Sequence, residues 1–110
     1  MKMPLITISI LLTVCFSVTP GFCDTRKGKK IDGKKAFDKH CAVCHPKGGN
    51  TINTQKPLTK KSLTANRVKS VKGIVGKMRN PGPGMTKFDE KTISNREAEA
   101  IAKYILKAFP

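Results

Sequence analysis

The sequence predicts an all-α fold with three to four helices. Apolar residues recur at intervals of three and four in several stretches, which is the spacing of a helix that buries one face. The clearest stretches follow residues that cap helices well, namely Asp32, Ser70 and Ser94. No stretch stands out as a strand, and no internal repeat is visible.

The first expected helix covers residues 33–41, with Phe37 on its apolar face. Residues 46–57 are rich in Gly, Pro, Asn and Thr and lack a sustained period, which is typical of a loop. A short helix is expected over residues 59–66, with Leu63 facing inward.

A clearer helix is expected to begin after Ser70, because its apolar residues follow the i, i+3, i+4, i+7 pattern. Two prolines within residues 80–84 end this helix, since proline cannot donate a backbone hydrogen bond. The last helix is expected to start at a capping box formed by Ser94 and Glu97 and to run to about Ala108. Its apolar stripe comprises Ile101, Tyr104, Ile105, Ala108 and Phe109.

Residues 1–23 have the pattern of a secretory signal peptide that is cleaved after export. Lys2 provides the positive start, and residues 5–18 form an apolar stretch that is short for a membrane span. A retained anchor helix is the alternative. A lipoprotein anchor is less favoured, because bulky residues precede both Cys15 and Cys23.

Residues 24–110 are then expected to form a single domain of 87 residues with a thin core. The net charge of the whole chain is +15, and the removal of Lys2 leaves about +14. Such a field favours redox partners with acidic docking surfaces, or an anionic membrane surface. General solvation by lysines explains the same composition equally well. Aromatic residues are few and secretion removes the usual targets, so we expect no nucleic-acid partner.

The five residues Cys41-Ala42-Val43-Cys44-His45 match the attachment site of a c-type haem. In such a site, the two thiols add to the porphyrin vinyl groups and become thioethers, and the adjacent imidazole becomes the proximal iron ligand. We therefore expect one haem c per chain, bound covalently through Cys41 and Cys44, with His45 as an axial ligand. Thioether attachment takes place after export, which agrees with the predicted signal peptide.

Three other kinds of site also use a pair of cysteines two residues apart. Structural zinc requires four Cys or His ligands, and outside the signal peptide the only further candidate is His40. A thioredoxin-like redox pair requires a βαβ context, which the surrounding pattern lacks. A structural disulfide is disfavoured by the two-residue gap and by the adjacent histidine. Haem attachment is the favoured interpretation.

The sixth iron ligand is expected to be Met85. It follows a Pro- and Gly-rich loop and lies outside any helical stripe, so the loop can direct its thioether at the iron. Met78 falls on the apolar stripe of a helix and is expected to pack in the core. His40, next to Cys41, is expected to be an exposed helix residue.

With these residues assigned, the chain resembles the small monohaem class I cytochromes c, in particular the cytochrome c6 and c-553 group. The resemblance covers nearly all of residues 32–109. It is carried by DGKKAFDKHCAVCH, GGNTINTQKPLTKKSL, NPGPGMTKF and SNREAEAIAKYIL. It implies the class I cytochrome c fold, with helices wrapped round one haem whose edge is exposed. It also implies that the first and last helices cross, with Gly33 and Phe37 facing Ile101 and Tyr104.

The expected function is a monomeric, periplasmic one-electron carrier with His/Met ligation, and not an enzyme. A filled sixth position argues against substrate chemistry, and methionine ligation raises the reduction potential. The alternative is a haem protein with a labile Met85 that binds a gas or peroxide. Photosynthetic members of the c6 group usually have Ala before the methionine and often Pro after it, whereas Gly84 and Thr86 flank it here. A respiratory or extracellular electron-transfer chain is therefore the expected context.

Overall fold

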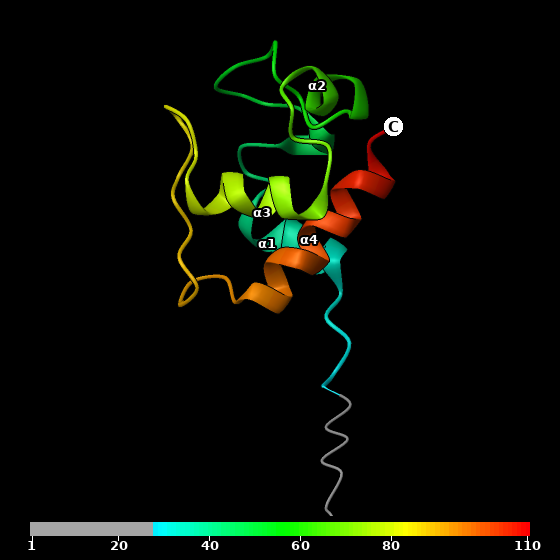
Figure 1. The fold of residues 1–110 in the computed structure, drawn as a ribbon, viewed down its shortest axis with the longest axis vertical. Coiled ribbons are helices and arrows are strands. Elements are labelled where there is room, and N and C mark those ends of the chain that lie inside the picture. The colour runs from blue at the N-terminus through cyan, green and yellow to red at the C-terminus, as the bar shows by residue number, and fades with distance from the viewer. Residues whose placement is uncertain (1–27) are drawn as a thin grey trace, which may run out of the picture.

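The computed structural model describes residues 28–110, and these form an all-α fold (Figure 1). The signal peptide predicted for residues 1–23 lies outside the described residues. The helices and the single 3-10 turn follow one another as α1 (Gly33–His40), η1 (Pro46–Gly48), α2 (Lys60–Ala65), α3 (Val71–Arg79) and α4 (Asn95–Ala108). Residues 28–110 contain no strand, so the predicted fold class is confirmed.

The predicted caps are formed at the three helices for which they were expected. Asp32 Oδ1 accepts hydrogen bonds from the backbone N–H groups of Lys34 and Lys35 at 3.0 and 3.1 Å. Ser70 Oγ accepts the N–H of Gly73 at 3.0 Å. A cap of this kind contributes about 1 kcal/mol, because it satisfies an N–H that the helix leaves unpaired. Each helix therefore begins where its own sequence specifies.

The cap of α4 departs from the prediction in one respect. Ser94 Oγ accepts the N–H of Glu97 at 3.3 Å, as a capping box requires. The carboxylate of Glu97, however, pairs with His40 at 3.2 Å and so connects α4 to α1. Glu97 therefore holds two helices together.

Helices α1 and α4 cross at close range near the centre of the molecule (Figure 1). Gly33 lies directly against the backbone of Ala100, where a Cβ atom would collide with the Ala100 carbonyl. One turn later, Phe37 is only 2% exposed, and its ring centroid lies 5.3 Å from that of Tyr104 and 5.5 Å from that of Phe109. The helix crossing implied by the resemblance is confirmed.

The core lies between α1, α3 and α4, and α3 also packs on α4. Ile93 and Ile101 are completely buried at its centre. The other buried apolar residues are Ala36, Phe37, Leu63, Val68, Ile74, Met78, Ala98, Ala102 and Ile105. The long connection between α3 and α4 runs along one edge of this core and is drawn in yellow and orange in Figure 1. It carries Met85, and its path determines where that side chain lies.

Replacement of Gly33 by alanine is expected to destabilise the fold by about 1–3 kcal/mol, because α1 and α4 must separate to admit the methyl group. Chemical unfolding of the haem-loaded protein measures this loss. Gly76→Ala is the matched control, since nothing lies within 4 Å of a Cβ atom at Gly76 in the middle of α3. That variant should gain about 0.5–1 kcal/mol from helix propensity. Equal effects of the two substitutions would contradict the close crossing.

Candidate haem-binding site

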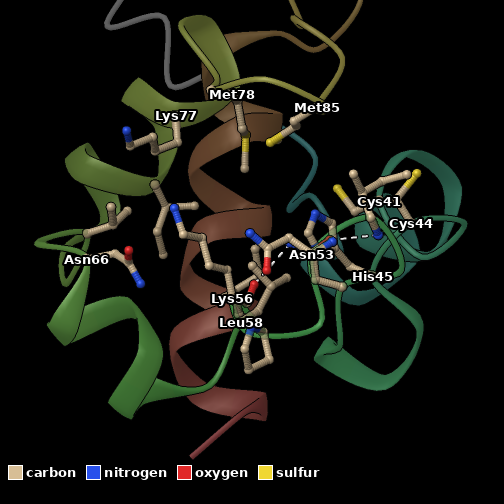
Figure 2. Close-up of a pocket in the computed structure, with 18 of the residues that line it drawn as sticks. Cys41, Cys44, His45, Asn53, Lys56, Leu58, Asn66, Lys77, Met78 and Met85 are labelled. Carbon is tan, nitrogen blue, oxygen red and sulfur yellow. Dashed lines mark hydrogen bonds between the residues drawn. The ribbon is translucent and has the colours of Figure 1, made fainter.

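The four residues predicted to bind haem all line one cavity of about 320 Å³. Cys41, Cys44 and His45 reach it from the chain that leaves α1, and Met85 reaches it from the connection between α3 and α4. In Figure 2, Met85 lies at the top of the view, while the cysteines and His45 lie at the right. Segments that are 40 residues apart in the sequence thus meet at one site.

The walls of the cavity suit a large, flat, apolar group. They are formed by side chains from α2, α3, α4 and the connecting loops, many of them buried. The apolar lining comprises Pro57, Leu58, Leu63, Val68, Ile74, Met78, Phe88 and Ile105. Polar side chains line the same cavity and include Asn50, Asn53, Lys56, Asn66 and Lys77. A porphyrin has the same division, with an apolar ring and charged propionates, so these residues fit a haem.

One ring nitrogen of His45 is committed to the backbone. Its Nδ1 lies 2.8 Å from the carbonyl oxygen of Gly49, and only a protonated Nδ1 can donate to that oxygen. In the neutral imidazole with this tautomer, Nε2 has the lone pair that a metal-binding imidazole requires. This carbonyl belongs to the loop predicted for residues 46–57.

A tight turn brings the Gly49 carbonyl back to His45. Lys47 and Gly48 have positive φ angles of 50° and 79°, and the N–H groups of Gly48 and Gly49 donate to the carbonyls of His45 and Pro46. Positive φ is easily adopted by glycine, so Gly48 is suited to this position. The imidazole is therefore oriented by residues that directly follow it in the sequence.

Asn50 organises the next part of the loop, which forms another side of the cavity. Its Oδ1 accepts the N–H groups of Ile52 and Asn53 at 3.1 and 2.9 Å, and its Nδ2 donates to the carbonyl of Lys56 at 3.0 Å. Asparagine commonly supports turns in this way. Sequence reasoning did not identify Asn50, although an asparagine after two glycines was an available signal.

The Cys41 thiol differs from the reactive thiol of a redox pair. Cys41 is half-buried and Cys44 is exposed. Burial raises the pKa of the Cys41 thiol to about 11, so this thiol is protonated at neutral pH. Reactive CxxC pairs instead require a lowered thiol pKa. Within residues 28–110, no group of three or more His, Cys, Asp or Glu side chains could hold a metal ion, whereas structural zinc requires four ligands.

Both methionines of the described chain line the cavity. Met78 is 3% exposed and belongs to the core, as predicted, but it also forms part of the cavity wall. Met85 is 37% exposed on a loop where Gly84 adopts a φ angle of 86°. Figure 2 shows the two side chains near one another, apart from His45. Either methionine could therefore reach a haem iron from the side of the cavity away from His45. Met78 is held on α3, whereas Met85 lies on a loop.

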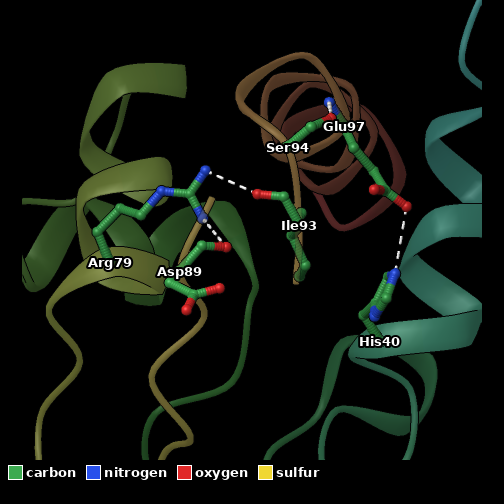
Figure 3. A network of polar contacts seen from close by, with 6 residues as sticks. All are labelled: His40, Arg79, Asp89, Ile93, Ser94 and Glu97. Atoms are coloured by element: carbon green, nitrogen blue, oxygen red, sulfur yellow. Dashed lines mark hydrogen bonds and ion pairs between the residues drawn. The ribbon is translucent and has the colours of Figure 1, made fainter. Parts of the chain in front are cut away.

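The prediction that His40 is an exposed helix residue is wrong. Its side chain is only 12% exposed, and its Nε2 lies 3.2 Å from Glu97 Oε1 (Figure 3). Its ring also lies edge-on to that of Phe88. The crossing of α1 and α4 buries His40, and the periodicity of α1 alone gives no indication of this.

Arg79, at the end of α3, was not identified from the sequence. Its guanidinium donates four hydrogen bonds to the segment that leads into α4, three of them to backbone carbonyls. Backbone carbonyls belong to every residue type, so the sequence contains no signal for these contacts.

Comparison with known families yields one match over most of the described chain. A family model described as "Cytochrome C oxidase, cbb3-type, subunit III" matches residues 28–105. Among curated proteins, cytochrome c6 of Leptolyngbya boryana is 38% identical over 74 residues, which is 67% of this chain and 86% of that protein. Cytochrome c6 of Pyropia yezoensis is 31% identical over 100 residues, which is 90% of each chain.

Solved structures give the same result at the level of the fold. The outer membrane cytochrome F (OmcF) of Geobacter sulfurreducens superposes with a TM-score of 0.69 at 41% identity, over 71% of this chain and 99% of that one. Cytochrome c6C of Synechococcus sp. PCC 7002 superposes with a TM-score of 0.65 at 30% identity, over 70% of this chain and 93% of that one. The similarity therefore spans nearly the whole of each relative.

Proposed function

We propose a function from one premise: the chain belongs to the small monohaem class I cytochromes c, carries one covalently bound haem c and acts as a haem-based electron carrier. We propose that Cys41 and Cys44 hold the haem through thioethers and that His45 and Met85 are its axial ligands. We also propose that residues 1–23 are a signal peptide that is cleaved and that residues 24–110 form a single cytochrome c domain.

One observation carries the ligand assignment. Both thiols, an imidazole with a free Nε2 and a loop methionine line the same apolar cavity. The hydrogen bond from His45 Nδ1 to the Gly49 carbonyl fixes the ring orientation and makes the imidazole a stronger ligand. Met85 is favoured over Met78 because a loop can adjust the position of a thioether, whereas Met78 is held in the core by α3.

A haem bound in this cavity would supply a reversible one-electron change at its iron. The protein's own residues bind and orient it: two sulfur atoms fix its position, and the apolar walls exclude water. Methionine ligation raises the reduction potential, and ligands that stay in place in both redox states keep the reorganisation small. We propose no substrate for this protein beyond the electron.

We propose that the protein works as a monomer in a bacterial periplasm, within a respiratory or extracellular electron-transfer chain. The pattern of residues 1–23 and the chemistry of thioether attachment, which follows export, support this location. Among the helices of residues 28–110, none has both the length and the apolar character needed to cross a bilayer.

We propose that the partner presents an acidic docking surface. Residues 39–88 contain eleven Lys and Arg residues and no Asp or Glu. Every cavity-lining residue except Ile105 comes from this span, so the cavity lies in a region of one charge sign. Such a field speeds the encounter with an anionic partner. An anionic membrane surface would be attracted by the same charge.

The alternative function is binding of a gas or peroxide after displacement of Met85. The partial exposure of this residue is the observation that supports it. A stable thioether–iron charge-transfer band in the oxidised protein, with no carbon monoxide binding in the reduced protein, would exclude it.

Replacement of Cys44 by serine is expected to reduce covalent haem sharply, because one of the two thioethers cannot form. The measurement is the haem stain of purified protein after denaturing electrophoresis, from a host with intact cytochrome maturation machinery. Val43→Ala is the control, since Val43 is exposed within the same motif and has no assigned role. A normal yield of covalent haem in the serine variant would refute the proposed attachment.

Replacement of Met85 by alanine is expected to leave the haem attached but to free the sixth iron position. The charge-transfer band of the oxidised protein should disappear, and the reduced protein should bind carbon monoxide. Met78→Leu is the control, because it conserves volume in the core and should leave both properties unchanged. The opposite result, with the band lost only in Met78→Leu, would assign the ligand to Met78.

Electron transfer with an anionic oxidant such as hexacyanoferrate is expected to slow as ionic strength rises, because salt screens the attraction. Lys56→Glu should slow it at low salt, since Lys56 lines the cavity. Lys35→Glu is the control, because it changes the charge by the same amount at an exposed residue of α1 that does not line the cavity. A rate that is independent of salt, or equal in both variants, would leave the lysines without a docking role.

A further inference from the structure

We propose that Arg79 is a positioning residue, whose guanidinium clamps the base of the loop that carries Met85 and so keeps the thioether at the sixth iron position. This inference rests on the proposed function, in which Met85 is that ligand. Arg79 is the last residue of α3 and does not line the cavity.

The guanidinium of Arg79 makes four hydrogen bonds. Its Nη1 donates to the carbonyl oxygens of Phe88 and Asp89 at 3.0 and 3.1 Å. Its Nη2 donates to the carbonyl oxygen of Ile93 and to Oδ1 of Asn95, both at 2.9 Å. Figure 3 shows the bonds to Asp89 and Ile93. One side chain at the end of α3 is thereby bonded to four residues between the loop and the first turn of α4.

These contacts do not represent an ordinary surface ion pair. Three of the four acceptors are backbone carbonyls, and the carboxylate of Asp89 accepts instead from the backbone N–H and the hydroxyl of Thr92, at 2.8 and 2.9 Å. Hydrogen bonds from a charged donor are stronger than neutral ones. The planar guanidinium also fixes the directions of its donors, which a lysine cannot do. The arrangement therefore fixes the path of the backbone.

The loop is closed at the same place by a second contact. The N–H of Phe88 donates to the carbonyl of Met78 at 2.9 Å, directly beside the Arg79 contacts. Residues 79 and 88 thus form a narrow base, and the intervening residues project from it. Met85 lies three residues from this base.

The body of the loop has few bonds of its own. Among the described residues, the backbone bond that involves Met85 runs from its N–H to the Gly82 carbonyl and is 3.5 Å long, at the limit of a hydrogen bond. Pro81 and Pro83 restrict their own φ angles, which reduces the number of conformations open to this loop without fixing it. A short segment with a fixed base keeps its far end near one place, whereas the same segment on a loose base can move further from it. The fixed base at Arg79 therefore limits how far Met85 can move.

Removal of the clamp should make displacement of Met85 easier, because the loop gains freedom when the thioether leaves the iron. The experiment is a titration of the oxidised, haem-loaded full chain with imidazole, followed by loss of the charge-transfer band. Arg79→Gln should bind imidazole at least about tenfold more tightly than the unmodified protein, as expected when hydrogen bonds from a charged donor are lost. Arg79→Lys keeps the charge but loses the planar arrangement of donors, so its imidazole affinity should lie between those of the unmodified protein and Arg79→Gln.

Two controls separate positioning from general stability. Arg96→Gln removes the same charge from the exposed first turn of α4 and should leave imidazole affinity unchanged. Ile101→Val weakens the core where α1 and α4 cross, and its unfolding temperature should fall without a change in imidazole affinity. Equal imidazole affinities in Arg79→Gln and the unmodified protein, or an equal gain in Ile101→Val, would overturn the inference.

Met85→Ala distinguishes this inference from the function on which it rests. If Met85→Ala does not increase imidazole affinity, the ligand assignment is wrong. If it does and Arg79→Gln does not, only the clamp is wrong. If Arg79→Gln yields no folded protein, Asn95→Ala provides a second test. It removes only one of the four acceptors of Arg79, and Asn95 is an exposed residue. That variant should gain about threefold in imidazole affinity, and no gain would contradict the clamp.

Discussion

The close crossing of α1 and α4 is the constraint on which the rest of the structure depends. It is possible because Gly33 presents no side chain to the Ala100 carbonyl, and it is reinforced one turn later by the packing of Phe37 on Tyr104 and Phe109. Helix α1 ends at His40, immediately before the two cysteines, so the crossing also sets where the haem-binding segment starts. A shift of this contact would move the thiols relative to the cavity that α3 and α4 help to form.

The two sides of the cavity are held by different kinds of contact. On the histidine side, the bond from His45 to the Gly49 carbonyl spans four residues, and the Asn50 turn follows directly. On the methionine side, Met85 lies on a loop whose base is held by Arg79 through bonds that span nine to sixteen residues. Local contacts re-form whenever the chain folds, whereas the longer ones require α3 and α4 to be in place. The support of the methionine side therefore depends on the packing of α3 and α4, whereas the support of the histidine side comes mainly from the residues that follow it.

This difference explains what the sequence could predict. The caps at Asp32, Ser70 and Ser94 and the helical periods are local properties, and they agree with the structure except that Glu97 does not complete the capping box at Ser94. The pairing of His40 with Glu97 spans 57 residues and depends on the angle at which two helices cross, which no local pattern encodes. Arg79 donates mainly to backbone carbonyls, which every residue has, so the identity of the neighbouring residues does not reveal these contacts. The motif therefore indicated Cys41, Cys44 and His45, whereas the contacts that hold the loop of Met85 could be recognised only in the folded structure.

The strong positive charge is best understood from the positions of the few acidic residues. Those of the described chain lie on α1, on α4 or in the segments that lead into these helices, and most have a hydrogen-bond or ion-pair partner. Asp32 caps α1, Asp89 closes a turn with Thr92, and Glu97 pairs with His40, while Asp38 and Glu99 pair with lysines one turn away. The span that forms the cavity contains none. The field there is therefore positive because carboxylates are excluded from the span, as well as because lysines are present. An anionic partner of the kind that we propose would therefore be attracted most strongly to the side of the molecule that carries the cavity.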